Sequence, residues 1–148
     1  MSNTTTDLTQ HPPRSPRQRL GGYALVPRML DKGRATIAGK NGEYHYACPL
    51  DQRALEFLGL DPEALKAELA TGKGDGEMLA WIQANQKNKH TAEEIAQWST
   101  DADNRVPDAD SREFFQKYLS ECGPNRSDIK NWPDLLELDD YVSFGGKA

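Results

Sequence analysis

Apolar residues recur at helical spacing along most of the chain, and the first clear stripe begins at residue 26. Its members, separated by four, three and four positions, are Val26, Leu30, Gly33 and Ile37. That spacing places them on one face of a helix. Pro27 suits the first turn of this helix, and Gly39 suits its end. Gly33 has no side chain, so it permits another helix to approach closely.

The other face of this predicted helix is polar, with Arg28, Asp31, Lys32 and Thr36. Because apolar residues make up only 36% of the chain, we expect a compact core beneath much solvated helix surface. Asn41-Gly42 then favours a tight turn. A short hairpin near residues 36–46 is therefore an alternative for this segment, although one hairpin does not make a sheet protein.

Helical signals continue to the C-terminus. Asp61-Pro62-Glu63 supplies an N-cap acid, a proline at the first helical position and an acid in the first turn. Thr91 and Glu94 form a capping box. No fixed period recurs, which argues against a repeat array. The pattern predicts an all-α fold, a single compact bundle of six or seven short helices.

The N-terminal segment differs from the rest in composition. Polar Thr and Asn dominate residues 1–10, where only Leu8 is strongly apolar, and we expect a flexible N-terminus there. Residues 11–19 are rich in Pro and Arg and predict an extended arm across the domain. A chain of 148 residues is large enough for one ordinary core. We therefore expect a single helical domain over residues 11–148.

The net charge of −5 hides an asymmetry between the two parts of the chain. Residues 1–40 contain seven Lys or Arg and two Asp, whereas residues 41–148 contain eleven basic and 21 acidic residues. One explanation is that the basic front packs against the acidic remainder, including Asp134, Glu137, Asp139 and Asp140. Another is that several arginines converge on an anion, because a guanidinium grips carboxylate or phosphate with two hydrogen bonds. The overall acidity disfavours nucleic acid as a partner.

The sequence shows no sign of export or membrane insertion. It has no N-terminal apolar run like that of a signal peptide, and no run of roughly eighteen apolar residues that would predict a membrane span. We therefore expect a cytoplasmic protein without a membrane partner, with Cys48 and Cys122 as free thiols. The oligomeric state stays open.

The densest group of reactive side chains lies in residues 44–51. Cys48 and His45 could act as nucleophile and base, with Asp51 orienting the imidazole. Adjacency in sequence argues against this, since such groups usually meet through the fold. Burial of Cys48 and the neighbouring tyrosines is the alternative. Three His and two Cys are too few for the paired ligands of a zinc site, so we predict neither a metal nor a cofactor.

We predict one pocket for an anion, bordered by Arg17, Arg28, Arg34, Tyr44 and His45. These residues form a basic and polar-aromatic concentration in an acidic protein. A helix that begins near Pro27 would point its positive end towards the same region. The competing explanation is that the arginines form salt bridges to the acidic helices.

Five segments carry a resemblance to known sequences, and they read DLTQHPPRSPR, RLGGYALVPRMLDKGRA, GEYHYACPLDQ, SREFF and LLELDDYVSF. Through these segments, which span nearly the full chain, the protein resembles a family of small bacterial proteins of unknown function. The resemblance implies a single cytoplasmic domain. It implies no activity, cofactor or substrate.

Three functions fit these observations. The first is a non-enzymatic binding module for an anionic small molecule or an acidic protein segment. The alternative is a small enzyme that acts on an anionic substrate through Tyr44, His45 or Cys48, with arginines as electrophiles. The third is a purely structural or interaction protein whose arginines only hold the arm in place. A solvent-open His45 within reach of Cys48 would favour the enzyme.

Overall fold

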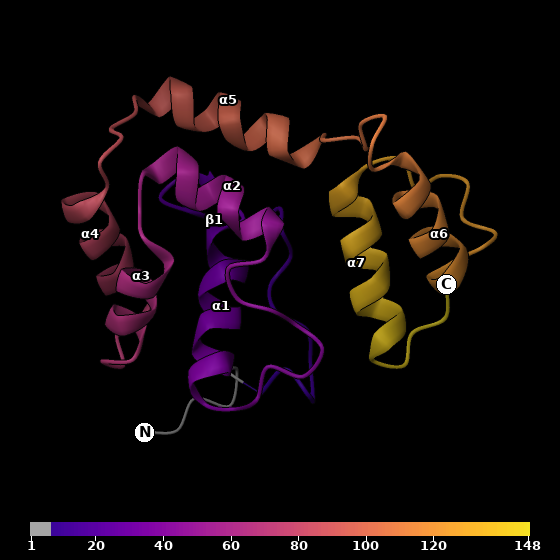
Figure 1. Ribbon diagram of the computed structural model, residues 1–148, viewed down its shortest axis with the longest axis horizontal. Coiled ribbons are helices and arrows are strands. Elements are labelled where there is room, and N and C mark those ends of the chain that lie inside the picture. Colours follow the sequence, from indigo (N-terminus) through magenta and orange to yellow (C-terminus); the bar gives the residue numbers. More distant parts are fainter. Residues whose placement is uncertain (1–6) are drawn as a thin grey trace.

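The computed structural model describes residues 7–148, which form seven helices and one two-stranded hairpin (Figure 1). The helices are α1 (Val26–Ile37), α2 (Pro49–Leu58), α3 (Pro62–Leu69), α4 (Asp75–Asn85), α5 (Ala92–Asp103), α6 (Arg112–Cys122) and α7 (Trp132–Ser143). The strands are β1 (Arg19–Leu20) and β2 (Tyr23–Ala24), which pair antiparallel. The prediction of an all-α fold built from short helices is confirmed.

Helix α1 is buried on its polar face as well as on its apolar face. Val26 and Leu30 are buried as the stripe predicts, whereas Ile37, in the last turn, is 41% exposed. Arg28 and Lys32 are each 4% exposed, so these two positions of the polar face do not belong to the solvated helix surface expected from the composition. Carboxylates from other elements cover both cations, which makes their burial possible.

Gly33 allows α1 and α3 to lie close together. A Cβ atom at this position would lie 2.6 Å from Cδ1 of Leu69 and 3.3 Å from ring atoms of Tyr46. The predicted close approach of a second helix is therefore confirmed. The partner is α3, which carries Leu69 as its last residue.

The hairpin lies at residues 19–24 and not near residues 36–46, where the sequence offered it as an alternative. Gly21 and Gly22 form its two-residue turn with φ of 60° and 86°, a conformation that glycine adopts without strain. Residues 36 and 37 complete α1 instead, and the chain then turns through Gly39 at φ 70°.

The apolar core is divided into two clusters. The larger one contains residues of the hairpin and of all five helices from α1 through α5. Its fully buried side chains include Met29, Leu30, Leu58, Leu65 and Met78. The smaller one joins α6 and α7 through Phe115, Leu119, Ile129, Leu135 and Leu138. Figure 1 shows α6 and α7 as a pair beside the other five helices. Since the two clusters are separate, polar contacts contribute much of the junction between them.

Residues 7–10 form a turn that packs against the domain. Leu8 is 1% exposed, and its N–H donates to the carbonyl of Lys40 at 2.9 Å. This part of the segment predicted to be a flexible N-terminus is therefore anchored, because Leu8 is its one large apolar side chain. Residues 1–6 lie outside the described part of the chain.

Candidate functional site

Arg14 of the arm and Arg34 of α1 bind the same two carboxylates. Arg14 contacts Asp31 at 2.9 Å and Asp75 at 2.6 Å. Arg34 contacts Asp75 at 2.9 Å and Asp31 at 3.8 Å. The hydrogen bonds to Asp75 and Asp31 raise the pKa of Arg14, and the hydrogen bond from Arg14 lowers the pKa of Asp75. The four charges therefore neutralise one another where the arm crosses α1 and the start of α4.

The other two arginines of the arm bind acidic side chains of α7 and α5. Arg17 pairs with Glu137 and, at 2.6 Å, with Asp134, both on α7. Arg19 pairs with Asp103, the last residue of α5, at 2.7 Å. These ion pairs agree with the first explanation of the charge asymmetry, in which the basic front packs against the acidic remainder.

Arg28 and Tyr44 meet on one carboxylate of α7. Nη1 of Arg28 lies 2.8 Å from Oδ2 of Asp140, and the two side chains are 5% and 9% exposed. The Tyr44 hydroxyl donates to Oδ1 of Asp140 at 2.8 Å, and Cζ of Arg28 lies 5.5 Å from the centre of the Tyr44 ring. Burial, followed by the hydrogen bond to Asp140, raises the pKa of Tyr44. Burial alone would lower the pKa of Arg28, but the hydrogen bond and charge of Asp140 outweigh it and raise that pKa.

The five residues predicted to border one anion pocket are thus distributed over separate contacts. Arg17, Arg34 and the pair of Arg28 with Tyr44 each bind different carboxylates. His45 is exposed, and within residues 7–148 its side chain makes no hydrogen bond or ion pair. Binding of one anion by this set stays a prediction, and the two cavities described below are lined by other residues.

Cys48 contacts a lysine and not the neighbouring histidine. Nζ of Lys32 lies 3.2 Å from Sγ of Cys48 and 3.0 Å from Oδ1 of Asp51. Asp51 therefore orients the lysine. The described part of the chain shows no hydrogen bond between His45 and Cys48, so the geometry gives no support to a nucleophile and base formed by this pair.

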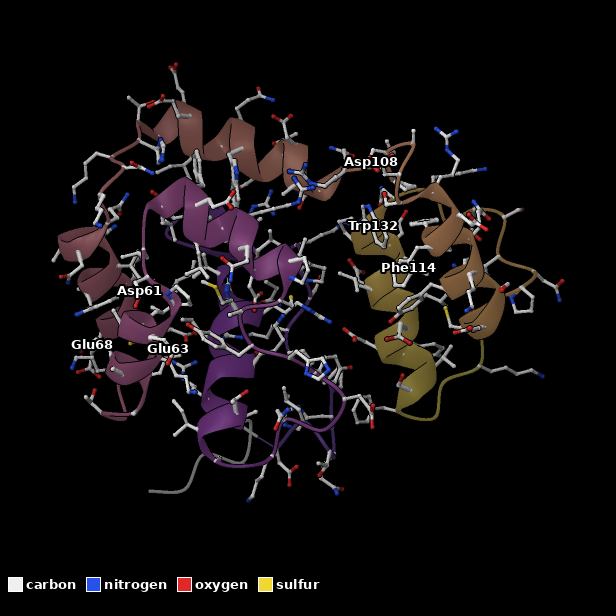
Figure 2. The ribbon with its side chains drawn as sticks, viewed as in Figure 1. Asp61, Glu63, Glu68, Asp108, Phe114 and Trp132 are labelled. Atoms are coloured by element: carbon white, nitrogen blue, oxygen red, sulfur yellow. The ribbon has the colours of Figure 1, made fainter. Side chains whose placement is uncertain are left out.

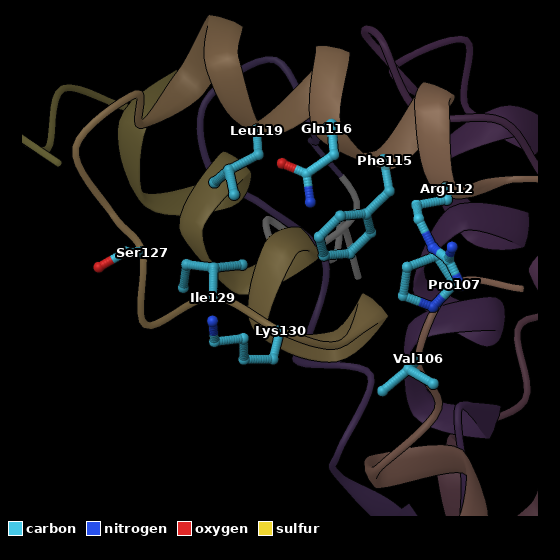
Figure 3. Close-up of a pocket in the computed structure, with 9 residues that line it drawn as sticks. All are labelled: Val106, Pro107, Arg112, Phe115, Gln116, Leu119, Ser127, Ile129 and Lys130. Carbon is cyan, nitrogen blue, oxygen red and sulfur yellow. The ribbon is translucent and has the colours of Figure 1, made fainter.

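A groove of about 420 Å³ lies beside α6 (Figure 3). Its apolar lining consists of Val106, Pro107, Phe115, Leu119 and Ile129. Its polar lining consists of Arg112, Gln116, Ser127 and Lys130. Figure 3 shows the side chains of α6 along one side, the loop that carries Ser127, Ile129 and Lys130 along the other, and Val106 and Pro107 near one end. The groove thus combines an apolar wall with cations on both of its sides.

The floor of the groove is held firmly by the smaller core cluster. Phe115 is 1% exposed and packs edge-on against Trp132, with ring centres 5.0 Å apart. Ile129 is 7% exposed and belongs to the same cluster. Oδ1 of Asp108 accepts from the N–H of Ser111 at 2.9 Å, which fixes the turn that leads into α6. The groove is therefore preformed on a rigid support, as binding sites usually are.

The two cations of the groove differ from the arginines of the arm in their pairing. Within residues 7–148, Arg112 and Lys130 make no ion pair or side-chain hydrogen bond, and both are exposed. Arg14, Arg17 and Arg19 are all bound to carboxylates of the chain itself. An incoming anion would therefore meet available positive charge in the groove, whereas at the arm it would have to displace a bound carboxylate.

A second, smaller cavity of about 280 Å³ lies between α7 and the loop before it. Its polar lining contains Arg126 and the acids Asp128, Asp134 and Glu137. Arg126 is already paired with Asp128 at 2.8 Å. The excess of carboxylates makes this cavity unsuited to an anion.

Sequence reasoning did not find the groove, since its parts are separated along the chain. Arg112 begins α6, and Lys130 precedes α7 by two positions. The one signal in the sequence was Val106, an apolar residue beside a proline, and the structure shows it 61% exposed in the loop before α6. An exposed apolar side chain next to unpaired cations indicates a contact surface only after the fold has brought them together.

Residues 7–148 contain neither a cluster of metal ligands nor a membrane-spanning helix. No group of three or more His, Cys, Asp or Glu side chains is arranged to hold a metal ion within this range. None of the helices in the same range combines the length and the apolar character needed to cross a bilayer.

Comparison with known proteins places the chain in a family without assigning an activity. No curated protein matches the sequence. The match to a family extends over residues 10–142 and thus over most of the helical domain. The chain therefore belongs to the family described as a domain of unknown function (DUF5069).

Proposed function

We propose that this chain is a non-enzymatic binding protein that recognises an acidic segment of another protein in the α6 groove. One observation carries the proposal: Arg112 and Lys130 border an apolar groove, and within the described residues neither forms an ion pair or a side-chain hydrogen bond. A carboxylate of the partner would form a charge-assisted hydrogen bond there without displacing an acid of this chain. The apolar wall supplies the area that such a contact needs for affinity.

The exposure of the lining favours a protein segment over a small molecule. The four polar side chains that line the groove are all exposed. A small ligand would keep much of its surface in water here, whereas typical small-molecule sites bury most of the ligand. Val106 is 61% exposed and offers apolar surface that a partner side chain would cover. An acidic residue next to a large apolar residue matches both features.

The surroundings of the groove are compatible with an acidic partner despite the net charge of −5. Asp108 lies near the start of α6, but its carboxylate is engaged by Ser111. Figure 2 shows Asp61, the N-cap of α3, and Glu68 of α3 at the other side of the molecule from Phe114 of α6. Repulsion from distant acids is screened over about 8–10 Å at physiological salt. Arg112 and Lys130 thus supply the positive charge of the groove lining, and Asp128, whose charge acts on Lys130, is itself paired with Arg126.

A random peptide library displayed on phage, selected against the full chain, tests this function. We expect enriched peptides to share Asp or Glu adjacent to Leu, Phe or Trp. Selection against the Arg112→Glu variant should lose this motif, because the groove then repels acids. Selection against Lys117→Glu should retain it, since Lys117 is exposed on the same helix but does not line the groove. A library that yields no common motif, or the same motif with all three proteins, would contradict the proposal.

A further inference from the structure

The contact between Lys32 and Cys48 joins α1 to the N-cap of α2, and the proposed binding function makes no use of it. The Lys32 and Asp51 side chains are 5% and 2% exposed, and they form an ion pair at 3.0 Å. Nζ of Lys32 also lies 3.2 Å from Sγ of Cys48, which is partly exposed. A small oxidant can therefore reach the sulfur, while the nitrogen is held against it from the interior.

The backbone before Cys48 is held in an uncommon conformation. Ala47 has φ of 59°, in the left-handed region that costs free energy for a residue with a Cβ atom. Its N–H donates to Oδ2 of Asp51 at 2.9 Å, and its carbonyl accepts from Nε2 of Gln52 at 3.1 Å. Asp51 thus fixes both the loop that carries Cys48 and the lysine that faces the sulfur. Such over-determined strain is typical of functional positions.

We propose that Cys48 and Lys32 form a covalent cross-link when the protein meets hydrogen peroxide, with a bond between Sγ and Nζ. In the first step the peroxide oxidises the Cys48 thiol to a sulfenic acid and is itself reduced to water. Lys32 then passes one proton to Asp51, and the free amine attacks Sγ. The N–S bond forms, the S–O bond breaks, and the hydroxyl leaves as water with the second amine proton. Asp51 releases its proton to solvent.

General sulfur chemistry and the position of Asp51 both favour this reaction over further oxidation of the sulfur. Sulfenic acids are known to condense with nitrogen, even with the weakly nucleophilic backbone amide. Burial raises the pKa of Asp51 although Lys32 opposes it, so the carboxylate is a better proton acceptor than an exposed aspartate. Cys122 provides the internal comparison, because no ammonium group contacts its sulfur within the described residues.

Peptide mapping of the full chain after treatment with hydrogen peroxide tests the proposal. After quenching with iodoacetamide, trypsin should release residues 29–34, uncleaved at Lys32, joined to residues 41–53. The joined pair should weigh about 2 Da less than the sum of the two peptides, as a condensation of a sulfenic acid with an amine requires. Reduction with dithiothreitol before quenching should restore cleavage at Lys32.

Variants separate this cross-link from general oxidation. Cys122→Ala should retain the joined peptides, and Cys48→Ala should abolish them. Lys32→Gln should also abolish the joined peptides. The test does not depend on whether this variant folds, because the wild-type map alone decides the result. Conversion of Cys48 to sulfinic or sulfonic acid, with normal cleavage at Lys32, would overturn the proposal. A joined pair that carries one additional oxygen would overturn the direct N–S bond.

Discussion

Arg28 and Asp140 form an ion pair that links α1 to α7 across 112 positions of sequence, with both side chains less than one-tenth exposed. The pair thus connects a helix of the larger apolar cluster with a helix of the smaller one. The Tyr44 hydroxyl completes the hydrogen bonding of Asp140. Because α6 and α7 share few apolar contacts with the rest, this buried polar contact is central to their attachment.

Replacement of Arg28 by Ala should therefore destabilise the protein strongly. It leaves Asp140 buried without its counter-ion, and breaking a buried pair in this way costs about 3–5 kcal/mol. Arg17→Ala is the matched control, since Arg17 is about one-third exposed and an exposed pair contributes about 1 kcal/mol or less. The measurement is urea unfolding of both variants. Equal destabilisation by the two replacements would show that burial of the Arg28 pair does not matter.

The shared carboxylate of Asp75 should make stability sensitive to acid. The hydrogen bond from Arg14, assisted by Arg34, lowers the pKa of Asp75 below its usual value of 3.8. Such a group stabilises the fold at pH values above the unfolded pKa, and this contribution is lost as the pH falls through the folded pKa. The difference in unfolding free energy between wild type and Asp75→Asn should be constant near neutral pH and should shrink below pH 3.8. A difference that grows on acidification would contradict the assigned ion pairs.

Leu8 should contribute to the core although it precedes the arm. Its side chain is 1% exposed, and truncation of a buried leucine to alanine costs about 2–5 kcal/mol. Gln10→Ala is the control, because Gln10 is exposed and such changes usually stay within about 0.5 kcal/mol. Thermal and urea unfolding measure the change in stability for both variants. A loss for Leu8→Ala no larger than that for Gln10→Ala would mean that residues 7–10 do not stabilise the domain.

Cys122 should react slowly with alkylating reagents in the folded protein. Burial, assisted by the charge of Asp139, raises the pKa of this thiol above its usual value of 9.0. Since the thiolate is the reactive form, the rate of alkylation should reach half its maximum only above pH 9.0. Alkylation of the Cys48→Ala variant over a pH series measures this directly. A midpoint at or below 9.0 would contradict the placement of Cys122 between Asp139 and the core.

Local sequence signals predicted the helices well because caps and periodicity act over a few residues. Asp61 accepts from the N–H of Ala64, and Thr91 and Glu94 form the predicted capping box. Gly33 marks the close approach of α3. The hairpin was missed at Gly21-Gly22, although two glycines between short apolar-containing segments are a known turn signal.

Long-range contacts could not be predicted from periodicity. Arg28 and Lys32 lie on the polar face of α1, and only the fold places Asp140 and Asp51 over them. Sequence composition correctly indicated many arginines facing many acids, but it could not say which arginines were neutralised. Composition also gave no sign that the two cations of the groove, Arg112 and Lys130, form no ion pair within residues 7–148.

Exchanging the charge of Arg112 with that of an acidic residue in a bound peptide tests most directly whether the α6 groove binds acidic segments. A peptide selected against wild type, with its acidic residue intact, should bind Arg112→Glu at least about tenfold more weakly, as expected for loss of a charge-assisted hydrogen bond. The same peptide with that acid changed to Lys should bind Arg112→Glu better than it binds wild type. Lys117→Glu should bind the original peptide like wild type. Affinities by fluorescence polarisation that show this reversal support an acid-binding groove at α6, and equal weakening of both peptides by Arg112→Glu would contradict it.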